Sequence, residues 1–146
     1  MAELLAFNYK IIKIRLDRFI NCPNVYSLMK NFAPDIFRQR LVIEGIYSIK
    51  PTPKILKECM QELSQKLGMK IIYGPIVKNI AEKINPKHGG YECVLIWAES
   101  GASIYTWKRN NFFSIDIYTC RPFKSEDAVK FIKEKFQTIE LDFKDF

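Results

Sequence analysis

The sequence predicts a two-layer α+β sandwich, in which an antiparallel β-sheet carries its helices on one face. From residue 40 onward the patterns follow the order β-α-β-β-β-β-α-β, with two amphipathic helical patterns separated by consecutive strand patterns. Consecutive strands joined by short turns pair antiparallel, so the apolar stripes of both helices can cover one face of a single sheet. With 146 residues, the chain is long enough to bury such a core.

The first strand and the first helix of this pattern have clear boundaries. Residues 40–47 are apolar and rich in residues that favour β-structure. Thr52 followed by Pro53 predicts a helix start, because threonine can cap the first turn and proline suits the first helical position. Apolar residues recur at helical spacing as far as Leu67, and Gly68 predicts the end of the helix.

The middle of the chain predicts strands rather than helices. Residues 70–73 predict a short strand, and the prolines and glycines of residues 74–90 predict a long loop. Residues 91–98 predict a buried strand. Two more strands are predicted at 102–107 and 112–119, and the second of these alternates apolar with partly polar residues. This alternation indicates a sheet with one covered face.

The C-terminal end of the chain carries clear secondary-structure signals, whereas the N-terminal end carries no recognisable motif. Ser125 is predicted to cap a second helix with an acidic first turn, and residues 139–143 predict a final strand. Residues 9–16 alternate like a strand and residues 24–32 predict a short helix, but no motif is recognisable there. We therefore treat residues 1–39 as an N-terminal extension of unknown role.

The composition argues against several classes of function. The formal net charge of +7 is spread along the chain without a block of like charges, so a nucleic-acid partner is not expected. The longest apolar run is too short to cross a bilayer and no secretory signal opens the chain, so we expect a cytoplasmic protein without a membrane partner. The four cysteines form no CxxC pair and there is one histidine, so no metal site is expected. Cys59 and Cys93 are predicted core residues.

The residues able to carry chemistry gather at the ends of strands. Glu99 and Ser100 follow one apolar strand, and Thr119 with Cys120 closes a later one. Taken alone, Ser100 is a turn serine that satisfies backbone groups, and Cys120 is a small core residue. Glu44 interrupts an apolar strand, where a carboxylate either faces solvent or needs a partner.

Several motifs taken together resemble those of the bacterial and archaeal S-adenosylmethionine decarboxylases. They are the strand Arg40-Leu-Val-Ile-Glu-Gly-Ile-Tyr47, Ala98-Glu99-Ser100, Ser103-Ile104, Thr106-Trp107, Asp116 and Thr119-Cys120. All fall at the spacing of that family, and the resemblance covers the domain of residues 40–146. It implies the S-adenosylmethionine decarboxylase-like fold and a pyruvoyl-dependent carboxy-lyase.

The resemblance also implies a cofactor made by the protein itself. The Ser100 hydroxyl would attack the carbonyl of Glu99, and elimination would leave fragments 1–99 and 100–146, with Ser100 converted to a pyruvoyl group. This group would act as electron sink in the decarboxylation of S-adenosylmethionine, a small-molecule substrate, for the synthesis of polyamines such as spermidine. Cys120 would return a proton to the product.

Three positions close to the proposed processing chemistry differ from the family pattern. Gly101 and Tyr105 stand where the family has histidines, and Glu92 stands where it has a serine that assists processing. A tyrosine is a poor base at neutral pH, whereas a glutamate with a raised pKa can act as one. Glu92 and Tyr105 are therefore the candidate processing pair, and Glu44 is the candidate substrate-binding residue.

Two alternatives stay open at this point. The missing histidines favour an uncleaved, catalytically inactive homologue that binds a ligand or regulates a partner subunit. Some proteins of this fold decarboxylate a basic amino acid instead, so the substrate is also open. Family members are usually dimers with the active site at the subunit interface, which implies a homodimer here.

Overall fold

The computed structural model describes every residue from 30 to 146 except 85 and 88. The chain divides into two compact units after Pro34, and the fold described below is that of residues 35–146. The N-terminal strand and most of the N-terminal helix that the sequence predicts lie outside the described residues. In the described part of the chain, no helix has the length and hydropathy needed to cross a bilayer.

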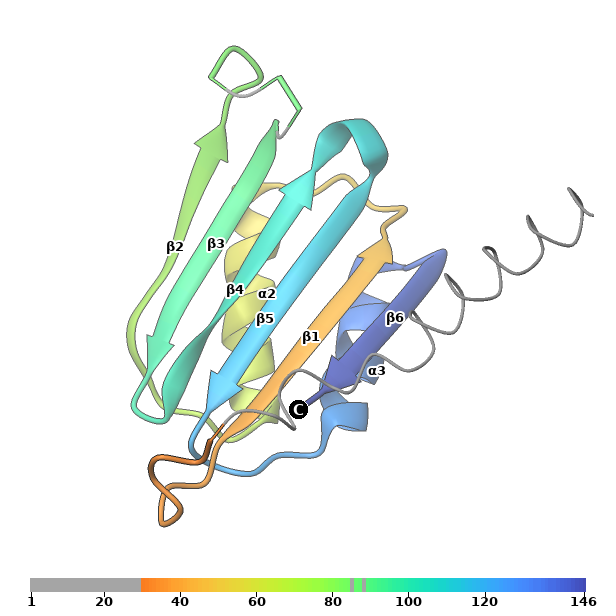
Figure 1. Cartoon of the computed structure of the whole chain (residues 1–146). Coiled ribbons are helices and arrows are strands. Elements are labelled where there is room, and N and C mark those ends of the chain that lie inside the picture. The colour runs from red at the N-terminus through yellow and green to blue at the C-terminus, as the bar shows by residue number, and fades with distance from the viewer. Residues whose placement is uncertain (1–29, 85, 88) are drawn as a thin grey trace, which may run out of the picture. The chain divides into compact units, whose positions relative to one another are not determined.

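Residues 35–146 form one six-stranded antiparallel sheet with two helices on one face (Figure 1). The strands lie in the order β2-β3-β4-β5-β1-β6, and every neighbouring pair is antiparallel. The elements are β1 (Gln39–Ile46), α2 (Pro53–Lys66), β2 (Ile71–Ile80), β3 (Gly90–Trp97), β4 (Ser100–Trp107), the 3-10 turn η2 (Lys108–Asn110), β5 (Phe112–Thr119), α3 (Ser125–Phe136) and β6 (Glu140–Asp145). The predicted fold class and order of elements are confirmed.

The two faces of the sheet have different environments. Alternate strand residues such as Leu41, Ile43 and Ile115 are fully buried against the helices, together with Cys59 and Cys93, which confirms the predicted core cysteines. Within the described part of residues 35–146, no helix covers the opposite side, which we call the open face. Its residues on the four inner strands are Glu92, Val94, Ile96, Gly101, Ser103, Tyr105, Trp107, Phe112, Ser114, Asp116, Tyr118, Arg40, Val42 and Glu44.

Helix α2 begins and ends as the sequence predicts. The Thr52 hydroxyl accepts a hydrogen bond of 3.2 Å from the first turn, and Pro53 occupies the first helical position. Gly68 follows the helix with φ +66°, a conformation that glycine adopts without strain. The Ser64 hydroxyl accepts a 2.7 Å hydrogen bond from the Trp97 indole, which ties this helix to the last residue of β3.

The long loop predicted at residues 74–90 is wrong for residues 74–80, whereas the described residues between Ile80 and Gly90 form no strand or helix. β2 continues to Ile80 and pairs with β3, with register shifts around Gly74 and Pro75. A proline lacks the N–H that a central strand needs, but β2 lies at the edge of the sheet, where this loss is tolerated. The glycine and proline therefore interrupt the register and not the strand.

The serine cap predicted for α3 is also wrong. The residue that precedes the helix is Lys124, and its side chain makes no capping hydrogen bond. Ser125 is the first helical residue. Its hydroxyl hydrogen-bonds the Asp145 carboxylate of β6 and accepts a 3.1 Å hydrogen bond from the Gln39 amide. The hydroxyl thus joins three elements, a tertiary use that local sequence could not reveal.

Candidate active site

The Glu99–Ser100 peptide bond lies in the tight turn between β3 and β4. Trp97 is the Cα partner of Ser100, so Ala98 and Glu99 alone make the turn. Ser100 has a φ of +134°, a region that costs a residue with a side chain about 1–3 kcal/mol. Backbone strain is therefore concentrated at the bond that the resemblance implies is broken.

The end of β5 holds the carbonyl of this bond. The backbone N–H of Cys120 donates a 2.9 Å hydrogen bond to the carbonyl oxygen of Glu99. Such a donor polarises the carbonyl toward a nucleophile and stabilises the oxyanion that forms on attack. The Cys120 side chain is exposed, which contradicts the alternative interpretation of this cysteine as a core residue. Its backbone amide contacts the turn through this hydrogen bond.

The Glu99 side chain is clamped from two sides. One carboxylate oxygen accepts a 3.1 Å hydrogen bond from the Lys70 backbone N–H, and the other lies 3.7 Å from a guanidinium nitrogen of Arg121. The same Arg121 nitrogen donates a 2.8 Å hydrogen bond to the Gly68 carbonyl. The carboxylate is thus fixed between the segment after α2 and the segment after β5. The sequence carried no motif that pointed to Arg121.

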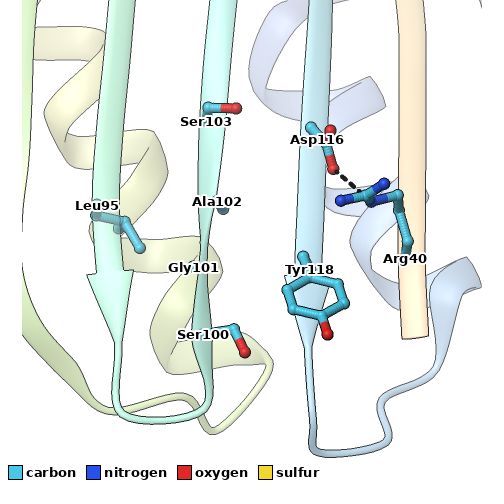
Figure 2. Close-up of a pocket in the computed structure, with 8 residues that line it drawn as sticks. All are labelled: Arg40, Leu95, Ser100, Gly101, Ala102, Ser103, Asp116 and Tyr118. Carbon is cyan, nitrogen blue, oxygen red and sulfur yellow. Dashed lines mark ion pairs between the residues drawn. The ribbon is translucent and has the colours of Figure 1, made fainter. Parts of the chain in front are cut away.

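Ser100 also lines a hollow of about 380 Å³ on the open face (Figure 2). The other lining residues are Arg40, Leu95, Gly101, Ala102, Ser103, Asp116 and Tyr118. Arg40 Nε lies 3.5 Å from Asp116 Oδ1, and the Arg40 guanidinium lies 5.3 Å from the centroid of the Tyr118 ring. In Figure 2 the Ser100 hydroxyl is directed toward β5, where the Tyr118 ring stands.

Sequence reasoning missed Arg40 and Tyr118 as site residues. The alternation along residues 112–119 had placed Tyr118 on the partly polar face of its strand, and this was the available signal. The sequence did not show which strand lies beside β5, because β1, which pairs with β5, is distant from it in the sequence.

The remaining three predicted side chains lie in one row across the open face. Glu92 of β3 is the Cα partner of Tyr105 in β4, and Tyr105 is the partner of Ser114 in β5. Ser114 is in turn the partner of Glu44 in β1. We call Glu92, Tyr105 and Glu44 the cross-strand row. The structure therefore brings the proposed processing pair together.

The cross-strand row lies away from the group around the scissile bond. We call Glu99, Ser100 and Cys120 the turn group. Tyr105 lies five positions after Ser100 on β4, which corresponds to about 17 Å along an extended strand. Within one subunit, the row and the turn group do not meet.

Gly101 occupies a position that excludes a side chain in this backbone conformation. A Cβ atom at Gly101 would lie 2.7 Å from the Leu95 carbonyl oxygen. That distance is shorter than real Cβ contacts, so a larger residue requires the neighbouring strand to move. Glycine at this position, where the family has a histidine, allows β3 and β4 to approach closely.

Comparisons with known proteins agree with the fold and the motifs. The family model for S-adenosylmethionine decarboxylase matches residues 47–146. The S-adenosylmethionine decarboxylase proenzyme of Clostridium botulinum (strain Langeland) is 32% identical over 87 residues, which are 58% of this chain and 69% of the relative. The proenzyme of the same name from Archaeoglobus fulgidus is 31% identical over 103 residues, which are 67% of this chain and 86% of the relative.

A solved structure carries the same fold. The crystal structure of the adenosylmethionine decarboxylase from Aquifex aeolicus VF5 aligns with a TM-score of 0.61 at 17% identity, covering 76% of this chain and 89% of that chain. The fold and the matched motifs place the chain in a class of pyruvoyl-dependent carboxy-lyases. The chain belongs to the S-adenosylmethionine decarboxylase family.

Proposed function

We propose that the chain is a proenzyme that cleaves itself between Glu99 and Ser100 and then decarboxylates S-adenosylmethionine for polyamine synthesis. The observation that supports this best is the hydrogen bond from the Cys120 amide to the Glu99 carbonyl. It places a donor on the carbonyl that the neighbouring hydroxyl would attack, at a residue whose φ is already strained.

A pyruvoyl group derived from Ser100 fits this position. Ser100 is partly exposed and lines an open hollow, so a substrate amine can approach the residue from solvent. The group supplies an electron sink when carbon dioxide is lost from an amino acid. The exposed Cys120 thiol follows the strand end that pairs with Ser100, where we propose that it returns a proton to the α-carbon of the product.

We further propose that the active unit is a homodimer in which two open faces pack together. Each subunit then supplies its cross-strand row, Glu92, Tyr105 and Glu44, to the turn group of the other. A two-fold axis in the plane between the sheets, passing over Ser103 of β4, reverses the strand direction. This axis brings the Tyr105 end of β4 in one subunit opposite the Ser100 end of β4 in the other subunit.

The open face has a composition that suits such an interface. Val94, Ile96 and Tyr118 are exposed on it, and Tyr73 of β2 lies beside Ile96. Contiguous exposed apolar side chains on a folded domain mark interaction sites. Sheets that pack face to face lie about 10 Å apart, a gap that glutamate and tyrosine side chains can bridge.

One observation favours the second candidate, an uncleaved homologue that binds a ligand or regulates a partner subunit. The side chains that line the hollow within one subunit include neither a histidine nor the Glu92 and Tyr105 pair. Without a second copy, Ser100 then lacks both members of the predicted pair, and elimination needs a base.

The intact mass of the purified protein tests the proposal. Processing converts the 17.2 kDa chain into fragments 1–99 and 100–146, and the second fragment lacks the ammonia lost on pyruvoyl formation. Ser100→Ala is the matched control and stays in one piece. A wild-type chain that also stays in one piece, with serine at position 100, supports the uncleaved homologue instead. Carbon dioxide release from S-adenosylmethionine, compared with release from arginine, lysine and ornithine, then identifies the substrate.

A further inference from the structure

Tyr118 and Ser100 share the hollow on the open face. Tyr118 is the Cα partner of Gly101, the residue after Ser100. Tyr118 is thus one position away from Ser100 in the register of β4 and β5, and both residues line the hollow. Figure 2 shows the ring standing on the side of the hollow toward which the Ser100 hydroxyl is directed.

The position of the Tyr118 ring is maintained by its neighbours on the open face. The Arg40 guanidinium lies 5.3 Å from the ring centroid, within the range of a cation–π contact. Arg40 is itself 3.5 Å from Asp116, two residues before Tyr118 on the same strand. The ring is therefore held from β1 while Tyr118 lines the hollow.

Two other groups of the open face with a mobile proton lie farther from Ser100 along the strands. Tyr105 lies about 17 Å along the same strand. Asp116 is the partner of Ser103, about 10 Å along the strand from Ser100, and its carboxylate faces Arg40.

We propose that the Tyr118 hydroxyl relays a proton in the first step of self-cleavage, a role that rests on the proposed processing of Ser100. In this step a bond forms between Ser100 Oγ and the Glu99 carbonyl carbon, and the bond from that carbon to the Ser100 nitrogen breaks. The proton of Oγ passes to the Tyr118 oxygen, and the proton of the phenol passes to the departing nitrogen. The product is an ester with a free amine, and no atom or electron is gained or lost.

A neutral phenol suits this relay because it donates and accepts a hydrogen bond at the same oxygen. A relay of this kind needs no ionised base, so the missing histidines do not prevent the first step. The partner's Glu92 and Tyr105 are then needed only for the later elimination, which removes a carbon-bound proton. The two steps thus depend on different residues.

Trapping of the ester with hydroxylamine separates the two steps. Hydroxylamine cleaves the ester between Glu99 and Ser100, and mass spectrometry of the full-length chain quantifies the products over time. Tyr118→Phe keeps the ring and its contact with Arg40, and we expect it to slow ester formation about 100-fold, the lower end of general acid–base effects. Tyr91→Phe, the same change at a partly buried tyrosine on the covered side of β3, is the matched control and keeps the wild-type rate.

The pH profile separates a relay from a structural role. The wild-type rate of ester formation stays nearly constant around neutral pH, because the relay takes up one proton and gives up another at the same oxygen. In Tyr118→Phe the rate rises about tenfold per pH unit, since hydroxide must remove the proton. In Tyr118→His a base is restored, and the rate rises between about pH 5.5 and pH 7.5 as the imidazole loses its proton.

The outcomes distinguish this proposal from the proposed function. A wild-type chain that forms no ester at any pH overturns both. Normal ester formation and cleavage in Tyr118→Phe overturn the relay alone and leave the processing of Ser100 standing. Slow ester formation in Glu92→Gln with Tyr105→Phe, beside normal formation in Tyr118→Phe, also overturns the relay and assigns the first step to the cross-strand row.

Discussion

The turn group and the cross-strand row differ in how the fold assembles them. The turn group is built from the β3–β4 turn and the residues after β5, and it has backbone strain and a polarised carbonyl. The row is built from the side chains of Glu92, Tyr105 and Glu44, which lie in register on β3, β4 and β1, with Ser114 of β5 between the last two. One group can start a reaction on its own backbone, whereas the other presents acids and a phenol to whatever covers the open face.

The separation of the two groups follows from strand geometry. Ser100 and Tyr105 lie on one strand, and an extended strand keeps residues five apart at about 17 Å whatever their side chains are. The predicted site residues therefore cannot all come together within one sheet, although their motifs are close in the sequence. A second copy of the sheet removes this restriction, because a two-fold axis reverses the direction of β4.

The largest predicted effect concerns this division between subunits. Ser100→Ala alone and Glu92→Gln with Tyr105→Phe alone are both expected to remain uncleaved. When the two variants are co-expressed, hybrid dimers form in which the Glu92/Tyr105 variant keeps its own Ser100 and receives an intact row from its partner. We expect cleavage of that chain to return, with its fragments recognised by mass through the Tyr105→Phe change.

The hybrid experiment can also contradict the proposed division of the site between two subunits. Cleavage that fails to return in the co-expressed pair, with dimers present by sedimentation, means that the row acts within its own subunit or not at all. Ser100→Ala co-expressed with wild type serves as the control for dilution of active chains.

A smaller effect is expected at the clamp on Glu99. Arg121→Met removes the cation 3.7 Å from the carboxylate while keeping the length of the side chain. Because the Glu99 carbonyl then loses part of its fixed orientation relative to the Cys120 amide, we expect self-cleavage to slow about tenfold. The free energy of unfolding changes by less than about 1 kcal/mol, since the Arg121 side chain is about half exposed and solvent screens its charge.

Cleavage rates and thermal unfolding measured on the same Arg121→Met preparation test this expectation. Arg109→Met, a change of the same kind in the turn η2 at the opposite end of β4, is the control and leaves the cleavage rate unchanged. Equal rates in both variants would show that the turn group needs no side-chain clamp.

The fold was predictable because its main elements carry local signals. Thr52, Pro53 and Gly68 fix the ends of α2, and the alternation along β5 indicates one covered face. The prediction failed at β2, where Gly74 and Pro75 lie inside a strand that only its edge position allows. Whether a strand lies at an edge is a property of the sheet and is not written in the segment itself.

The site was predictable only in part, for a related reason. Ser100, Glu99 and Cys120 were found because they are neighbours in motifs, and the structure brings them together at one end of the sheet. Arg40 and Tyr118 were missed as a pair because their contact depends on β1 entering the sheet beside β5. Local motifs predict residues that act through their own backbone, whereas cross-strand contacts require the topology.

The smallest predicted effect contrasts the thiol of the turn group with the thiols beneath the row. Cys93 is adjacent to Glu92 in sequence but faces the helices, and burial raises its pKa to about 11. Burial raises the pKa of Cys59 to about 12. Cys120 is exposed. At pH 8.5 we therefore expect iodoacetamide to modify Cys120 in the folded protein, while Cys59 and Cys93 react only after unfolding.

The same two buried thiols make stability depend on alkaline pH. Above about pH 9 a cysteine in the unfolded chain loses its proton, whereas Cys59 and Cys93 keep theirs in the fold. The unfolded state is then favoured increasingly, so the melting temperature should fall as the pH rises from about 9 to 11. Cys93→Ala should flatten this slope and Cys120→Ser should not. A flatter slope in Cys120→Ser, or labelling of Cys93 as fast as Cys120, would mean that the face beneath the row is open to solvent and that the two regions differ less than their burial indicates.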